Sequence, residues 1–213
     1  MALLAGVFSA GCRRPEYVKF ASDFGDLEGE VPWGWTAYLD KQGTDFYSYT
    51  FVGPFDPDFF RGVPSISVRW YAYKKYRFMP GNEAEMYTSA QDYIDKMLKW
   101  VYGPERSLEQ PMAAVKVSGW SATKFVVAAP ADVSGAAPFG VLRDAGTGRT
   151  AVLRWHGYIV VPMDNGFYVL VYPATRDGFK RYEGRFVHLI KTLRIKKDGP
   201  AGEVLAAPQD SGR

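Results

Sequence analysis

Residues 150–161 read TAVLRWHGYIVV, residues 164–166 read DNG, and residues 167–172 read FYVLVY. The two outer segments are rich in the β-branched and aromatic residues that favour strands. Asn-Gly between two apolar segments is the strongest short-range signal for a β-hairpin. This stretch therefore predicts two long antiparallel strands joined by a tight turn at Asp164–Gly166.

A second clear strand pattern lies earlier in the chain, over Ser65–Tyr73. Apolar residues occupy every second position from Ile66 to Ala72, and serine, arginine and tyrosine occupy the others. A period of two with one apolar face predicts a strand in a sheet that is covered on that side. Further strands are expected at Trp33–Leu39, Asp45–Val52, Met112–Ser118 and Ala122–Ala128, with a turn at Gly119 between the last two.

The periodicity changes to that of a helix between Asn82 and Val101, where apolar residues recur every three or four positions. Asn82 is the expected N-cap, and Gly103 is expected to end the helix. A second amphipathic helix is expected to begin at a cap on Asp177. Strands joined by hairpins, together with two amphipathic helices, predict an α+β fold in which the helices pack on an antiparallel sheet.

This order of elements resembles the PsbP-like fold, which is shared by photosystem II extrinsic proteins, Ran-binding Mog proteins and small bacterial lipoproteins. The resemblance rests on the early Gly34-Trp35, the helix after the third strand, the Arg149–Val161/Phe167–Tyr172 hairpin and the closing segment Phe186–Arg194. It implies an α/β/α sandwich over about residues 30–197. It brings no functional residues with it, because a fold alone does not specify a function.

Composition limits the function classes that need to be considered. The chain has 213 residues, of which 47% are apolar, which suits one well-packed domain. Its 26 basic and 23 acidic side chains are interspersed and leave a net charge of +3, so no basic stripe for nucleic acid is present.

The N-terminus resembles the back half of a bacterial lipoprotein signal peptide. Eleven small or apolar residues end in Ala10-Gly11-Cys12, the only cysteine of the chain, and the sequence then turns polar at Arg13. The resemblance implies that Cys12 is lipidated, with palmitate among its acyl groups. Residues 2–8 lack the basic residues of a signal peptide, so the true start codon is expected upstream of Met1. The alternative is that residues 1–11 form a frayed arm or a buried strand and that Cys12 is an ordinary small hydrophobe.

The resemblance also implies a location. Because residue 13 is arginine and not the aspartate that retains enterobacterial lipoproteins at the inner membrane, the protein is expected on the outer membrane, facing the periplasm, if the cell has two membranes. The expected organisation is a signal peptide over residues 1–11, a tether over residues 12–31, one PsbP-like domain over residues 32–197 and a disordered tail over residues 198–213.

Motifs that carry chemistry are scarce. The two histidines, His156 and His188, have no partner at metal-ligand spacing, and no nucleophile elbow, phosphate loop or EF-hand occurs. The sequence therefore predicts a non-enzymatic protein without a metal or cofactor. Its aromatic residues form a binding surface if they are exposed on the sheet, or part of the core if helices cover them. The candidates for that surface are Trp33, Trp35, Tyr71, Tyr73, Arg154 and His156.

Three functional hypotheses follow. The first is an envelope lipoprotein that binds another protein or assists assembly of an envelope complex, which a flat exposed aromatic patch would favour. The second is a lipoprotein that binds a small apolar or aromatic ligand, which an enclosed pocket would favour. The third is a hydrolase with a dispersed site, which a buried carboxylate near His156 would favour.

Overall fold

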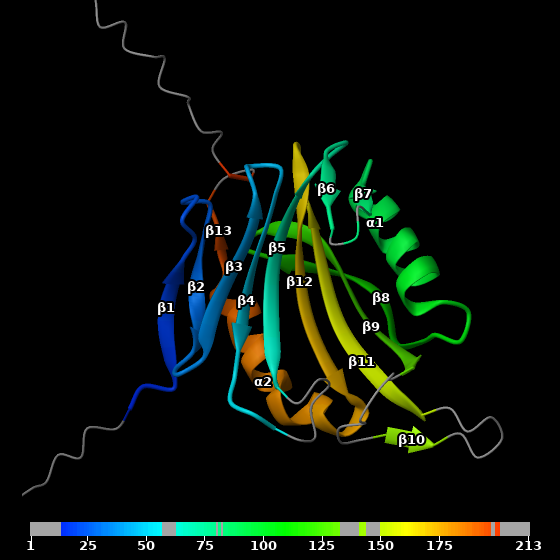
Figure 1. The fold of residues 1–213 in the computed structure, drawn as a ribbon. Helices are drawn as coiled ribbons and strands as arrows, with labels where there is room; N and C mark the ends of the chain where they lie inside the picture. The colour runs from blue at the N-terminus through cyan, green and yellow to red at the C-terminus, as the bar shows by residue number, and fades with distance from the viewer. Residues whose placement is uncertain are drawn as a thin grey trace, which may run out of the picture.

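The centre of the molecule is an eight-stranded antiparallel sheet, seen in a computed structural model that describes residues 14–56, 63–79, 81, 83–132, 141–143, 150–196 and 199–200 (Figure 1). Its strands lie in the order β3-β4-β5-β12-β11-β9-β8, and β10 pairs with β11 off this path. The strands are β3 (Thr36–Gln42), β4 (Phe46–Val52), β5 (Ser65–Ala72), β8 (Ser107–Val117), β9 (Trp120–Asp132), β10 (Val141–Arg143), β11 (Thr150–Pro162) and β12 (Gly166–Thr175).

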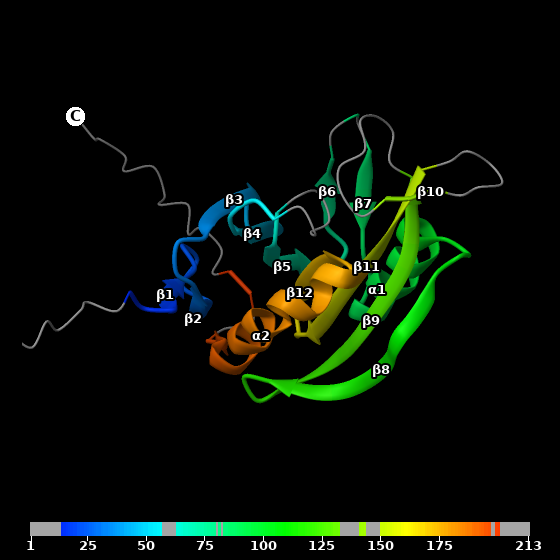
Figure 2. The same ribbon diagram turned by 90° about the horizontal axis from the view of Figure 1, so that it is seen from below.

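Helices cover both faces of this sheet. The helix α2 (Arg176–Thr192) packs on one face, and α1 (Ala90–Lys96) with the π-helix η2 (Met97–Tyr102) packs on the other (Figures 1 and 2). Two separate apolar cores result, one beneath each helix. The predicted α+β class, an antiparallel sheet packed by two helices in an α/β/α sandwich, is confirmed.

The predicted hairpin forms the middle of the sheet. The strands β11 and β12 pair from Pro162 opposite Phe167 to Arg154 opposite Thr175. At the turn, a Cβ atom on Gly166 would lie 2.2 Å from the carbonyl oxygen of Tyr71, so only glycine fits there.

The strand β5 differs from its prediction in one respect, because it is covered on both faces. Ile66, Val68 and Trp70 pack beneath α2, as the alternation indicates. Tyr71 is also buried, beneath α1. Arg69, two residues before Tyr71, therefore lies on a face that a helix covers. The sequence pattern alone predicts that this face is exposed to solvent.

The first helix begins later than predicted. Ser89, not Asn82, is the N-cap, and its hydroxyl accepts a hydrogen bond from the amide of Asp92 at 3.0 Å. The preceding residues form β7 (Ala84–Met86), which pairs with β6 (Tyr76–Phe78) in a small hairpin. Gly103 ends the helix with a φ of 69°, as expected.

The second helix is capped by Thr175, whose side chain accepts from the amide of Gly178, and not by Asp177.

The segment predicted to be a tether is largely folded. Residues 17–32 form β1 (Tyr17–Ala21) and β2 (Leu27–Pro32), which build a three-stranded sheet with β13 (Arg194–Ile195). The strand β1 carries exposed residues and β2 carries two half-buried glutamates, so this stretch has the polar composition of a linker. The domain therefore begins near residue 17 and not at residue 32.

A buried carboxylate joins this small sheet to the main one. Asp26 is 0% exposed and accepts hydrogen bonds from the hydroxyls of Tyr47 at 2.6 Å and Tyr168 at 2.7 Å. The hydroxyl of Ser22 also donates to it. Tyr47 belongs to β4 and Tyr168 to β12, so one side chain connects three parts of the chain that are far apart in sequence.

Several predictions about the chain ends fall on residues outside the described ranges. They are the signal peptide over residues 1–11, the lipidated Cys12 and most of the tail over residues 198–213. Within that tail, Gly199 lies against the ring of Trp70. Among the described residues, no helix is both long and apolar enough to span a bilayer.

Replacing Asp26 with alanine is expected to lower the free energy of unfolding by about 2–4 kcal/mol, because three buried hydroxyls lose a charged acceptor. Urea denaturation followed by circular dichroism measures the change. The control is Asp95→Ala, which removes an exposed carboxylate on α1 and is expected to change stability by less than about 0.5 kcal/mol. Equal losses in the two variants would show that Asp26 does not join the sheets.

Candidate binding pocket

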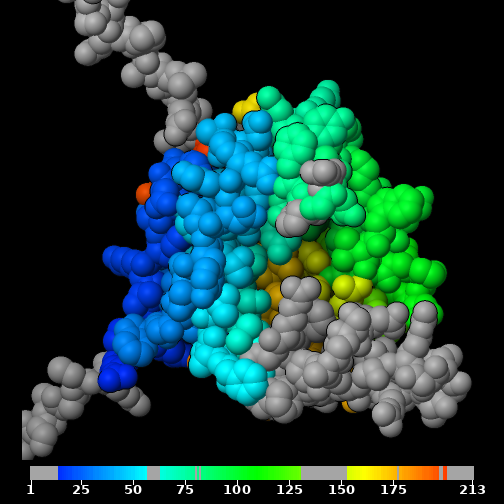
Figure 3. Space-filling view, viewed as in Figure 1, coloured from blue at the N-terminus to red at the C-terminus, as the bar shows by residue number. Residues whose placement is uncertain are grey.

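A pocket of about 400 Å³ opens on the face of the main sheet that carries α1 and η2. Figure 3 views this face and shows a hollow between β5 and the green helical segment, with the gold surface of the central strands at its floor. The polar lining residues are Thr50, Ser65, Ser67, Arg69, Tyr102, Arg154, His156 and Tyr158. The apolar lining residues are Val52, Val63, Val101, Val171 and Pro173.

Strand register aligns part of the floor in a row across the sheet. Thr50 on β4 pairs with Ser67 on β5, which pairs with Val171 on β12, which pairs with Tyr158 on β11. Because the pairing is continuous, these four side chains lie on the same face. The hydroxyls of Thr50 and Ser67 are 3.0 Å apart and hydrogen-bonded to each other.

The two arginines lie at opposite ends of this floor. Arg69 follows Ser67 by two residues on β5, while Arg154 and His156 precede Tyr158 on β11. Since Ser67 and Tyr158 share a row, Arg69 lies on one side of that row and Arg154 on the other.

The roof of the pocket is the end of the π-helix. In a π-helix the backbone hydrogen bonds reach one residue further than in an α-helix, which rotates the side chains that follow, and such turns are frequent at functional sites. Tyr102 is the last residue of η2 and is buried against the sheet, whereas Trp100 is 72% exposed. The π-turn therefore directs one phenol into the pocket.

Tyr102 is hydrogen-bonded to two side chains of β11. Its hydroxyl contacts Nδ1 of His156 and lies 2.7 Å from the hydroxyl of Tyr158. Burial raises the pKa of Tyr102 and of Tyr158, so both are neutral hydroxyls at neutral pH. The three side chains fix the end of η2 to the middle of the sheet.

Arg154 is held beside the same phenol. Its guanidinium lies over the Tyr102 ring, 4.5 Å from the centroid, and Nη2 donates to the carbonyl of Val101. Its Nε is buried and has no hydrogen-bond partner among the described residues. Arg154 thus keeps donor capacity inside the pocket.

Arg69 occupies the end of the pocket nearest α1. It contacts the hydroxyl of Tyr71 and lies close to Tyr93 of α1 and to Tyr158. It retains partial solvent exposure, and it lines the pocket. A guanidinium is charged at any pH a cell reaches, so this charge is permanent.

The described lining residues supply hydrogen-bond donors and apolar surface. No aspartate or glutamate is among the described residues that line the pocket. Two guanidiniums and several hydroxyls provide hydrogen-bond donors, and the valines and Pro173 provide apolar contact. Ser67 is bonded to Thr50 and His156 to Tyr102, so neither the Ser67 nor the Thr50 hydroxyl has a described contact with a base.

The six residues predicted to form a binding surface do not come together. Only Arg154 and His156 line the pocket. Tyr71 is buried beneath α1, and the partly buried Tyr73 packs beside it. Trp33 is 44% exposed, and the guanidinium of Arg14 lies over its ring. Trp35 packs near α2, beside Tyr182 and Arg185.

The other histidine has a structural environment. His188 on α2 lies 2.8 Å from Glu30 of β2 through Nε2, and its ring stacks on Tyr17 at 3.6 Å between centroids. These contacts join α2 to the small sheet. Among the described residues, no group of three or more His, Cys, Asp or Glu side chains could hold a metal ion.

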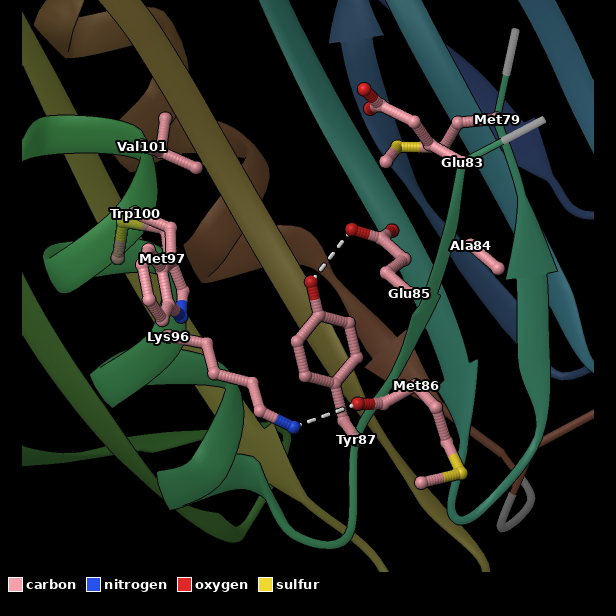
Figure 4. A pocket seen from close by; sticks show the side chains of 10 residues that line it. All are labelled: Met79, Glu83, Ala84, Glu85, Met86, Tyr87, Lys96, Met97, Trp100 and Val101. Carbon is pink, nitrogen blue, oxygen red and sulfur yellow. Dashed lines mark hydrogen bonds between the residues drawn. The ribbon is translucent and has the colours of Figure 1, made fainter. Parts of the chain in front are cut away.

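A second pocket, of about 410 Å³, lies between the β6–β7 hairpin and α1 (Figure 4). Two of its charged side chains, Glu85 and Lys96, make contacts with neighbouring residues. Glu85 pairs with Arg77 at 2.7 Å and accepts from Tyr87 at 2.7 Å, and Lys96 donates to the carbonyl of Met86 at 3.0 Å. Glu83 also lines this pocket, so its charged lining residues are two carboxylates and one ammonium, which is a less favourable set for an anionic ligand.

Sequence reasoning named only Arg154 and His156 and missed the other lining residues, among them Arg69, Tyr102, Thr50 and Ser67. One signal could have found Arg69, because an arginine between Val68 and Trp70 in a strand this apolar is unusual unless the charge is used. Tyr102 gave no such signal, since its direction depends on the π-turn.

Comparisons with known proteins give no family. No protein-family model matches the chain, and no curated protein shows significant sequence similarity. Among solved structures, a protein from Bacteroides thetaiotaomicron VPI-5482 is similar at 11% identity and a TM-score of 0.46 over 86% of this chain. This chain spans half of that protein's length.

Two further structures are similar over nearly their whole length. Cyanobacterial PsbP (CyanoP) from Synechocystis sp. PCC 6803 is 12% identical with a TM-score of 0.46, and the match covers 87% of this chain and 95% of that one. LpqN of Mycobacterium tuberculosis, described as involved in cell envelope biogenesis, is 12% identical with a TM-score of 0.42, covering 85% and 91%. Values this low do not assign a family or transfer a function.

Proposed function

We propose that this protein is a non-catalytic binding protein of the bacterial cell envelope, anchored through a lipid on Cys12, which takes a small ligand into the pocket between β4, β5, β11, β12 and η2. The pocket carries the proposal. Its volume of about 400 Å³ is within the range of small-molecule sites, and it combines apolar walls with a few polar groups.

The polar contacts favour binding over catalysis. A hydrolase needs a nucleophile, a base in hydrogen-bond reach of it and a group that orients the base. The described hydroxyls of Thr50 and Ser67 lie on β4 and β5, while His156 lies on β11, with β12 between them. A buried carboxylate beside His156, the feature that would favour a hydrolase, is not among the described lining residues.

The pocket also changes the expected ligand. A purely apolar or aromatic molecule would suit a pocket lined by Trp and Tyr alone. This pocket is lined by two arginines as well as two tyrosines. The proposed location in the cell envelope rests on the sequence alone, namely on Ala10-Gly11-Cys12 and the polar residues that follow. Binding of a protein partner, the first sequence-based hypothesis, has less support because its predicted aromatic residues are dispersed.

The pocket is tested by filling it. Thermal unfolding of the full chain is measured with a set of small organic compounds, for the wild type and for Ser65→Trp, which places an indole among the lining residues. A ligand present at 100 times its Kd is expected to stabilise the wild type by about 2.7 kcal/mol and to lose this effect in the variant. The control Thr36→Trp, at an exposed position on β3, is expected to respond like the wild type. Stabilisation that survives in Ser65→Trp would place the ligand elsewhere.

The anchor is tested by intact mass of the N-terminal peptide, from protein expressed at its native locus and recovered with membranes. A peptide that begins at Cys12 and carries diacylglycerol is expected, because the signal peptidase cleaves before the modified cysteine. Cys12→Ala is expected to remove the protein from the membrane fraction. An unmodified wild-type chain beginning at Met1 outside the membrane fraction would refute the lipoprotein assignment.

A further inference from the structure

The charge of Arg69 has no described counter-charge. Arg69 has no ion pair with any described residue, and its near neighbours are the tyrosines 71, 93 and 158. Burial raises the pKa of all three phenols, so at neutral pH they offer hydroxyl dipoles and no negative charge. A charge in such surroundings is costly unless it is paired.

The nearest candidate for a counter-charge is already engaged. Glu85 helps to raise the pKa of Tyr71 and Tyr93, but its carboxylate pairs with Arg77 at 2.7 Å and accepts from Tyr87 at 2.7 Å. Arg77 also lies 3.5 Å from Asp40, so Glu85 belongs to a cluster with Arg77 and Asp40 and makes no described ion pair with Arg69. An added anion at Arg69 would therefore meet an uncompensated guanidinium.

The rest of the pocket suits an uncharged body joined to an acid. Val52, Val171 and Pro173 give apolar surface beside the hydroxyls of Thr50 and Ser67. At the opposite end, Arg154 keeps a buried Nε without a described partner. A molecule that enters from solvent can therefore place an acidic group against Arg69 and still contact carbon along the floor.

We propose that the ligand is a small organic oxyanion, with a carboxylate or phosphate on a short apolar body, whose acidic group binds Arg69. This inference rests on the proposed function and adds the chemical class of the ligand. Guanidinium groups bind both oxyanions through two parallel hydrogen bonds, and neighbouring hydroxyls can supply further donors.

The test compares matched probes by isothermal titration of the full chain. They are 3-phenylpropionate, phenyl phosphate and the uncharged 3-phenylpropanamide, which keeps the apolar body and removes the charge. At least one acid is expected to bind about tenfold or more tightly than the amide. Arg69→Met is expected to remove that preference, and Arg69→Lys to keep part of it, because the charge remains while the paired geometry is lost.

The control Arg194→Met removes an exposed guanidinium of β13 and is expected to keep the preference. Equal binding of acids and amide by the wild type would overturn the oxyanion assignment and leave a pocket that binds neutral ligands. An acid preference that survives in Arg69→Met would overturn the role of Arg69. If no acid, amide or other small compound binds, both the proposed function and this inference fail.

A second measurement separates binding from a structural role and needs no ligand. If Arg69 is kept for an anion, Arg69→Met is expected to leave the unfolding temperature of the ligand-free protein unchanged or raised, because an uncompensated charge is replaced by an apolar side chain of similar length. A marked fall, with Arg194→Met unaffected, would identify Arg69 as a structural residue and overturn the inference.

Discussion

The difference in length between helices and strands shapes this molecule. The thirteen residues of β11 extend about 43 Å, whereas the seven residues of α1 and the six of η2 together extend about 20 Å. The helical segment is therefore about half as long as the longest strand of the sheet on which it packs. The covered part of the sheet face carries Tyr71, Phe167 and the other residues of an aromatic core. The remainder carries hydroxyls, a histidine and arginines, and the pocket forms where the helix ends.

The local features of the fold were readable from the sequence. The Asp164–Gly166 turn and the alternation of β5 depend on neighbouring residues, so pattern and turn chemistry predicted them. The small sheet was not predicted, because β1 and β2 are short, polar and stabilised by contacts with residues far along the chain. The prediction of the first N-cap was wrong for a related reason. Asn82 has a side chain suited to capping a helix, but the residues after it form a strand that pairs with β6.

The candidate site was less predictable than the fold. His156 and Arg154 were named as surface residues, and the structure places both in a pocket. Their partners come from β4, β5 and η2, and no spacing along the chain reveals that these elements meet. Tyr102 depends on a π-turn that leaves no recognised mark in the sequence. Asp26 was also missed. An acidic residue in a polar segment is expected at the surface, but Asp26 is the buried centre of a hydrogen-bond cluster.

The early start of β1 limits how far the domain can move from its attachment point. Four residues lie between Cys12 and Tyr17, and the five residue-to-residue steps span no more than about 18 Å even in a fully extended chain. With a lipid on Cys12, the start of the small sheet would stay within about 18 Å of the anchored cysteine in every conformation of the linking residues. The domain would then stay close to the bilayer surface, and a ligand of its pocket would have to be delivered or collected in the layer of solvent next to the membrane.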